Sequence, residues 1–213
     1  LIGLIGPNGA GKATLTNVLD GAIKPNSGTV YLGGNRIDQL QPFEVARHGL
    51  GRTFQVTRSF RRMTVLENLM VPALALDQGL SRSEIDDKAM EVLEFLTVDH
   101  LRNEYAKSLS GGQQKLLELG RLLMLNPDVI ILDEPFAGVH PKLMEIIYKY
   151  IERVNNDGTA IILISHQMDS IFSLCKRLLV LNYGDLIADG TPDVVKNDPT
   201  VIEAYLGSDD EED

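Results

Sequence analysis

An apolar run that ends in a glycine-rich loop opens the chain, and a helix-forming segment follows directly. Leu1–Ile5 has the short, fully apolar pattern of a buried parallel strand. We predict a helix from Lys12 to about Leu19. The loop between them fits the pattern G-x-x-x-x-G-K and consists of Gly6, Pro7, Asn8, Gly9, Ala10, Gly11 and Lys12. This order favours a layered α/β fold in which helices cover a mostly parallel sheet.

The chemistry of this loop suits phosphate groups. Glycines let the backbone fold around phosphates and point its amides at them. The N-terminus of the following helix adds positive potential, and Lys12 adds a full charge. An ordinary glycine-rich turn is the alternative, but the flanking strand, the flanking helix and the lysine argue against it. The loop therefore predicts that the chain binds a nucleoside triphosphate.

The residue after the lysine departs from this pattern, which continues with Ser or Thr. Ala13 stands there instead. The missing hydroxyl normally ligates Mg²⁺, so the metal must take another water or lose a ligand. Thr14 is adjacent, but one step along a helix turns its side chain by about 100°, so we do not expect a simple replacement. Two interpretations stay open: a tolerated substitution, or weakened hydrolysis.

Two acidic residues follow a second apolar strand, which we predict over Val129–Leu132. Asp133 and Glu134 stand at a strand end, where charged groups in parallel sheets meet their ligand. Asp133 can hold Mg²⁺ directly or through water, and Glu134 can polarise an attacking water as general base. An Asp-Glu pair after a strand is usually exposed to solvent and has no functional role. In combination with the phosphate loop it predicts a functional role.

A histidine stands at the end of another predicted strand, Ala160–Ile164. His166 follows Ser165 there, where it can bond a γ-phosphate and orient the attacking water. A lone histidine is more often structural, but this place on the ligand side of the sheet favours a role. The other histidines lack such a context, and the four together show no metal-ligand spacing; they are His48, His100 and His140.

Helical periodicity replaces the strand patterns between Thr57 and Leu125. One helix should begin at a cap on Ser81 or Ser83, and another just after Ser110. This segment is predicted to be a helical insertion between strands of the core. The other predicted strands and helices are strands at Thr29–Leu32, Leu50–Phe54, Leu178–Leu181 and Leu186–Ala188, helices from Pro141 and over Met168–Cys175, and a helical tail to Tyr205.

Composition excludes several classes of protein. The net charge is −10, from 30 acidic and 20 basic residues, which argues against a nucleic-acid partner. A single cysteine, Cys175, rules out an internal disulfide framework and fits a reducing compartment. The apolar runs are shorter than the ~20 residues of a membrane-spanning helix. We expect a solvated acidic tail at Ser208–Asp213, and residues upstream of Leu1, because a domain rarely starts within its core sheet.

With these residues assembled, the chain resembles the nucleotide-binding subunits of ABC transporters over nearly its whole length. Leu109 and the four residues after it match the signature of that family letter for letter. The resemblance implies a dimer, homodimeric or with a paralogue, in which one subunit caps the γ-phosphate of ATP bound to the other with Ser110, Gly111, Gly112 and Gln113. It also implies that Gln55 is the Q-loop glutamine, which serves Mg²⁺ and water and contacts the membrane subunit.

Longer segments resemble the importers of branched-chain and other hydrophobic amino acids. These segments are Gly51–Gln55, Phe60–Leu69, Glu134–Gly138, Gly190–Pro192 and Val201–Gly207. The lipopolysaccharide-export ATPase shares several of them and is the nearest rival. The chain departs from the family at Ala13, and at His140, where the D-loop usually has Asp or Asn. The adenine-stacking aromatic of the family would lie upstream of Leu1.

The resemblance implies a RecA-like P-loop NTPase core with an inserted helical subdomain. We expect the core at 1–56 and 127–183, the signature subdomain at 57–126, and a strand and helix extension at 184–213. The implied cofactors are ATP and Mg²⁺. The implied partners are permease subunits and, indirectly, a substrate-binding protein, with the chain peripheral on the cytoplasmic face of the membrane.

Two other functions are weighed against this ATPase. A non-hydrolysing ATP-binding switch is favoured by Ala13 and His140 and opposed by Glu134 and His166. A soluble ABC ATPase of DNA repair or translation is opposed by the absence of a long coiled-coil insertion or a second ATPase half in this sequence.

Overall fold

A six-stranded sheet forms the centre of the molecule. The computed structural model describes residues 1–55, 57–76 and 79–206, so the predicted acidic tail lies outside the described residues. The strand order is β4-β5-β6-β1-β7-β8. The strands are β1 (Ile2–Ile5), β4 (Leu50–Arg52), β5 (Val129–Asp133), β6 (Ala160–Ile164), β7 (Arg177–Asn182) and β8 (Asp185–Gly190). Neighbours from β4 to β7 pair in parallel and β8 pairs antiparallel with β7, which confirms the predicted mostly parallel sheet.

Both faces of this sheet are buried, and alternate residues of each strand serve opposite faces. In β5, Ile130 and Leu132 join the larger core with the helices that follow, while Ile131 joins the smaller core with Val45 and Ala10. Burial on both sides explains why the strands are continuous apolar runs in the sequence.

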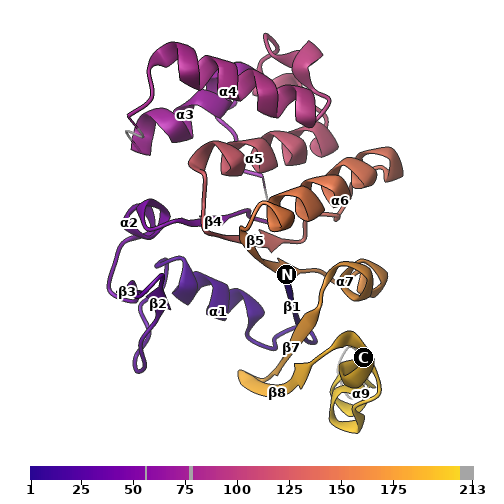
Figure 1. Cartoon of the computed structure of the whole chain (residues 1–213). Helices are drawn as coiled ribbons and strands as arrows, with labels where there is room; N and C mark the ends of the chain where they lie inside the picture. The colour runs from indigo at the N-terminus through magenta and orange to yellow at the C-terminus, as the bar shows by residue number, and fades with distance from the viewer. Residues whose placement is uncertain (56, 77–78, 207–213) are drawn as a thin grey trace.

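Three helices gather at one end of the molecule, far from β8 and α9 (Figure 1). They are α3 (Val65–Leu76), α4 (Arg82–Phe95) and α5 (Gly111–Leu125), with the short 3-10 turns η1 (Asp99–Leu101) and η2 (Ala106–Ser108) between α4 and α5. Ser81 caps α4 and Ser110 caps α5, each in a capping box with the residue three positions on. The two helices therefore begin where we predicted, after Ser81 and after Ser110.

The remaining elements surround the sheet. The helices are α1 (Lys12–Leu19), α2 (Pro42–Arg47), α6 (Pro141–Asn156), α7 (Met168–Leu174), α8 (Pro192–Lys196) and α9 (Pro199–Leu206). The hairpin of β2 (Tyr31–Leu32) and β3 (Asn35–Arg36) forms a small separate sheet. We predicted a longer strand from Thr29 and placed Asn35 in the turn, but Asn35 pairs with Leu32. Within the described residues, no helix is long and apolar enough to cross a membrane.

Candidate nucleotide site

Three neighbouring strands deliver the predicted phosphate and water-binding residues to one edge of the sheet. β5 and β6 run in register with Asp133 beside Ile164, so Glu134 and Ser165 leave the sheet side by side. β1 lies on the other side of β6 and ends at the glycine-rich loop. A cavity of about 340 Å³ opens here, lined by Asn8, Gly9, Ala10, Gly11, Lys12, Ala13, Thr14, Gln55, Asp133, Glu134, Ile164 and His166.

The loop backbone takes a shape that only glycine permits at two positions. Gly6 has φ +150°, and a Cβ there would lie 2.2 Å from the carbonyl oxygen of Leu181. Gly11 has φ +100° and precedes α1, so its left-handed backbone turns the chain into the helix. The first three residues of α1 line the same cavity as the loop, so the N-terminus of this helix lies at the cavity, where helix N-termini favour anions.

The Lys12 side chain folds back over its own loop. Its Nζ donates to the carbonyl oxygens of Gly6, at 2.6 Å, and Pro7, at 2.9 Å. Burial lowers the pKa of Lys12, and the nearby carboxylates of Glu134 and Asp133 oppose that shift. Gly6 and Pro7 are therefore partners of the lysine rather than part of the cavity lining.

Ala13 and Thr14 both line the cavity and both are exposed. A hydroxyl is absent at the first position and present at the second. We expected the step of about 100° along the helix to turn Thr14 away, but Thr14 still lines the cavity. The predicted consequence of Ala13 for Mg²⁺ stays a prediction.

Asp133 is held from β4. Its Oδ2 lies 3.3 Å from Nη2 of Arg52, and its backbone N–H donates to Oγ1 of Thr53 at 2.9 Å. Nη1 of Arg52 also donates to Asn17, at 2.7 Å, and to Asp20, at 2.6 Å. This network ties the carboxylate to the far end of α1. Our sequence analysis did not identify Arg52, although it is only three residues before Gln55.

Glu134 has an unusual backbone and a buried carboxylate. Its φ is +49°, in the left-handed region, and the residue is 9% exposed. Ser165 Oγ donates to Oε2 at 3.4 Å, and Nε2 of His166 lies 3.5 Å from Oε1. Burial raises the pKa of Glu134, whereas His166 and the hydrogen bond from Ser165 lower it. A buried carboxylate with a raised pKa, in a cavity, suits a general base.

His166 and Gln55 reach the same cavity from exposed positions. The side chain of His166 is 57% exposed, and Gln55 is exposed at the end of β4. Apart from Gly6 and Pro7, the structure therefore brings the predicted water, metal and phosphate residues of this chain together at one cavity.

The four signature residues lie outside the described lining of this cavity. Ser110 and Gln113 instead cap α5: the backbone N–H of Ser110 donates to Oε1 of Gln113 at 2.9 Å, and Gln113 N–H donates to Ser110 Oγ at 3.4 Å. Gly111 and Gly112 form the first turn after that cap. The N-terminus of α5 is exposed at Ser110 and Gly111.

His140, the second departure from the family, caps another helix. Its Nδ1 accepts a hydrogen bond from the backbone N–H of Lys142 at 3.3 Å, at the start of α6. Asp and Asn commonly fill this position because their oxygens accept the same bond. His140 therefore keeps the capping function with a different chemical group.

The donor set at the cavity fits Mg²⁺ with a nucleotide. Mg²⁺ takes oxygen ligands and is usually bound by one or two carboxylates together with substrate phosphates. Asp133 offers a carboxylate and Gln55 an amide oxygen, and Lys12 lies beside them. Across the described part of the chain, no three His, Cys, Asp or Glu residues form a metal-binding group.

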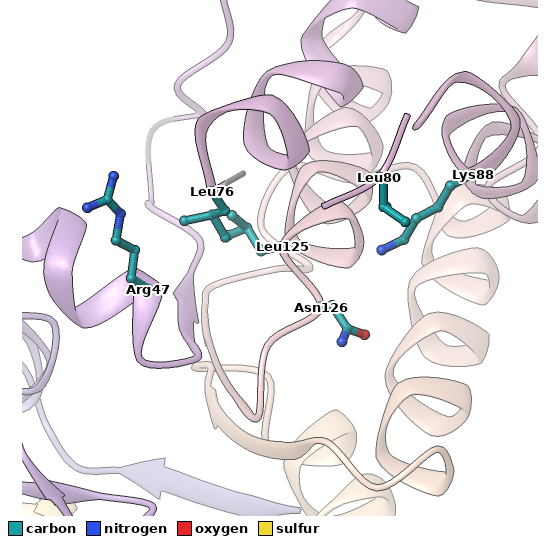
Figure 2. Close-up of a pocket in the computed structure, with 6 residues that line it drawn as sticks. All are labelled: Arg47, Leu76, Leu80, Lys88, Leu125 and Asn126. Atoms are coloured by element: carbon teal, nitrogen blue, oxygen red, sulfur yellow. The ribbon is translucent and has the colours of Figure 1, made fainter. Parts of the chain in front are cut away.

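A larger cavity, of about 700 Å³, lies elsewhere, where α2 faces the ends of α3 and α5 (Figure 2). Arg47 and Lys88 reach it from opposite sides, and its other lining residues are Leu76, Leu80, Leu125 and Asn126. The described lining holds two cations but neither carboxylates nor the glycine-rich loop. The features that suit phosphate groups thus lie at the smaller cavity.

Comparison with known proteins decides the family. A family model described as "ABC transporter" matches residues 1–137. The chain belongs to the ABC transporter family. A second model, described as "Branched-chain amino acid ATP-binding cassette transporter", matches residues 186–211 of this cassette.

Two curated relatives represent the two predicted subgroups. The high-affinity branched-chain amino acid transport ATP-binding protein LivG of Escherichia coli is 39% identical over 221 residues, which covers 97% of this cassette and 87% of LivG. The lipopolysaccharide export system ATP-binding protein LptB of Haemophilus influenzae is 37% identical over 207 residues, covering 97% and 86%. LivG is the more similar, so the export alternative is not favoured.

Solved structures confirm the predicted P-loop NTPase fold. The ADP conformation of an ABC transporter ATP-binding cassette superposes with a TM-score of 0.83 at 37% identity, covering 97% of this chain and 87% of that one. A dimeric cassette in a post-hydrolysis state, bound to ADP and phosphate, has a TM-score of 0.82 at 26% identity, covering 90% and 85%. Cassettes of this family bind nucleotide.

Proposed function

We propose that this cassette binds and hydrolyses ATP to energise import of branched-chain or related hydrophobic amino acids by an ABC transporter. The observation that carries the chemistry is the convergence of the glycine-rich loop, Asp133, Glu134 and His166 on one cavity. The observation that carries the cargo is the similarity to LivG, together with the match of residues 186–211 to the branched-chain model.

The charged and polar groups that we predicted at this cavity divide the work of ATP hydrolysis between them. The loop amides and Lys12 bind the phosphates, and His166 contacts the γ-phosphate. Glu134 accepts a proton from the attacking water; its Oε1 is buried and lies 3.5 Å from Nε2 of His166. Asp133 and Gln55 would hold Mg²⁺. When bound, Mg²⁺ neutralises charge between the β- and γ-phosphates.

The exposed N-terminus of α5 supplies the second half of the site across a dimer. Ser110 Oγ accepts from Gln113 within its own helix, and its O–H is left to donate to a phosphate. The amides at the start of α5 add positive potential. Because these groups lie outside the cavity lining of their own chain, we infer that they serve the nucleotide of a second subunit.

We place the permease at a groove beside Gln55. This groove, of about 360 Å³, runs between the end of β4 and helices α3 and α5, and Phe54, Val71 and Pro72 line it. Leu125 lines both this groove and the cavity of Figure 2, so the two lie on either side of that residue. Arg58 and Arg121 at the groove and Arg47 and Lys88 beyond it favour a segment that carries apolar and acidic side chains.

Reconstitution tests the cargo. The cassette is inserted with its permease subunits in proteoliposomes that contain ATP, and uptake of labelled leucine, isoleucine and valine is measured with a substrate-binding protein outside. We expect ATP-dependent uptake, which Lys12→Ala abolishes because the phosphate-binding charge is lost. Release of lipopolysaccharide from the bilayer without amino acid uptake would contradict the import proposal.

A further inference from the structure

Lys115 is a buried lysine on α5, and the mechanism above gives it no task. The residue is 7% exposed, and the next two positions of the helix, Leu116 and Leu117, are buried as well. An ammonium group that is withdrawn from water needs a partner that replaces its hydration. The ion pairs of the described residues do not include Lys115. The carboxylates of Glu118, Asp133 and Glu134 act on its charge only from a longer distance, and its hydrogen bond goes to a neutral group.

That partner is the backbone of Glu134. Nζ of Lys115 donates to the carbonyl oxygen of Glu134 at 2.8 Å, and both groups are buried. The same oxygen accepts a longer bond from the N–H of Ala137, at 3.3 Å. On its other side, the N–H of Glu134 donates to the carbonyl of Ile164 at 2.9 Å. The peptide groups before and after Glu134 are thus held by β6 and by α5.

The conformation of Glu134 depends on such restraints. A non-glycine residue at φ +49° is in a sparsely populated region, and it stays there only where its surroundings determine it. In this conformation the carbonyl points to Lys115 on α5, and the carboxylate lies against Ser165 and His166. The next residue is Pro135, whose ring fixes φ, so a change in ψ of Glu134 cannot be compensated there and would turn the Cα of Glu134 and its side chain.

We propose that Lys115 is a positioning residue for Glu134: from α5, the helix that Ser110 begins, it fixes the peptide that aims the carboxylate. This inference rests on the proposed role of Glu134 as general base. A misplacement of about 1 Å costs on the order of 100-fold in rate. Because the N–H of Ala137 still holds the carbonyl in a Lys115 variant, we expect a smaller loss, of about tenfold in kcat.

A double-mutant cycle tests the proposal. Lys115→Met, Glu134→Gln and the double variant are compared in single-turnover release of labelled phosphate, and nucleotide affinity is measured by fluorescence titration. We expect Lys115→Met to lower the cleavage rate by about tenfold and to leave affinity within about twofold, because the loop is intact. In the Glu134→Gln background the same change should have no further effect, since residues that act through one another are non-additive.

Two controls make the outcome specific. Lys149→Met removes an exposed lysine from α6 and should leave the cleavage rate unchanged. Lys115→Arg keeps a donor and should recover part of the rate. If Lys115→Met does not fold, Lys115→Gln, which shortens the donor, takes its place in the cycle. Equal loss of rate in both Glu134 backgrounds, or loss of affinity together with rate, would overturn the positioning role. An unimpaired Glu134→Gln would instead overturn the general-base role.

Discussion

The carboxyl edge of the sheet and the N-terminal end of α5 carry different parts of the predicted chemistry. One chain forms a complete cavity at the sheet edge, but it forms only an exposed helix start at α5. At the sheet edge, residues that follow β1 and β4 and residues at or just after the ends of β5 and β6 line a common cavity. At α5, Ser110 and Gln113 bond to each other and lie outside that cavity. Parallel strands bring distant residues together by register alone, whereas a helix cap is local and needs a second surface before it can act on a ligand.

The sharpest test of the sheet edge is Glu134→Gln. The amide preserves shape but cannot take a proton from water, so we expect a loss of about 10²-fold or more in kcat with ATP binding retained. The measurements are steady-state ATPase activity and size-exclusion chromatography, where an ATP-bound dimer should accumulate. Glu145→Gln, an exposed change on α6, is the matched control. Near-normal hydrolysis in Glu134→Gln would remove Glu134 from this role.

Sequence patterns predicted the sheet edge because each of its residues follows an apolar run. The strand ends at Ile5, Asp133 and Ile164 are visible as changes from apolar to polar or glycine residues. The start of α5 was equally visible, since the signature Ser110 and Gln113 also form a capping box.

Contacts between distant segments had no such signal. Arg52 reaches Asp20 and Asp133, which are 32 and 81 positions away, and Lys115 reaches the turn at Glu134 from helix α5. No local pattern marks these pairs. We predicted no bounds for α3 from the sequence, and Pro72 lies within this helix although a proline normally argues against a helix interior. The packing of α3 against α5 overrides that preference.

A mixing experiment tests whether α5 acts across a dimer. Ser110→Arg subunits and Lys12→Ala subunits should each be inactive alone, because every site of either homodimer lacks one half. After mixing, each heterodimer has at most one intact composite site, so about a quarter of the wild-type rate should return if subunits exchange randomly. ATPase activity is measured before and after mixing. Normal hydrolysis by either purified single variant would disprove the shared site.

Restoring a hydroxyl at position 13 tests whether the Mg²⁺ ligands at the sheet edge are complete without it. Lys12 and the loop amides remain in this chain, so Ala13 should cost rate more than affinity. We expect Ala13→Ser to raise the maximal rate by about two- to fivefold and to lower the Mg²⁺ concentration for half-maximal rate, because one metal ligand returns. Mg²⁺ titrations of ATPase activity compare the two forms, with Ala160→Ser, at the exposed start of β6, as control. Superimposable titrations would mean that Thr14 or water already completes the metal shell.

The smallest expected effect is on stability and concerns the contact between α5 and the segment after β4. There Glu118 of α5 accepts a hydrogen bond from the backbone N–H of Phe54 at 3.1 Å. Its second carboxylate oxygen is buried and has no hydrogen-bond partner among the described residues. Burial raises the pKa of Glu118, against the opposing effects of that hydrogen bond and of the nearby Lys115, Arg121 and Arg58. The ionised form therefore costs free energy in the folded state.

The sign of the pH dependence follows from this shift. A carboxyl whose pKa is higher in the folded state binds its proton more tightly there, so its contribution to stability falls as pH rises through the folded pKa. Glu118→Gln keeps the acceptor for Phe54 and removes the charge. We expect it to raise the free energy of unfolding by about 1 kcal/mol at pH 8. The gain should vanish toward about pH 4, near the unfolded pKa of glutamate. Urea unfolding across this range checks it, with exposed Glu91→Gln as control. A less stable variant at pH 8 would show that the surrounding cations outweigh the burial of the Glu118 carboxylate.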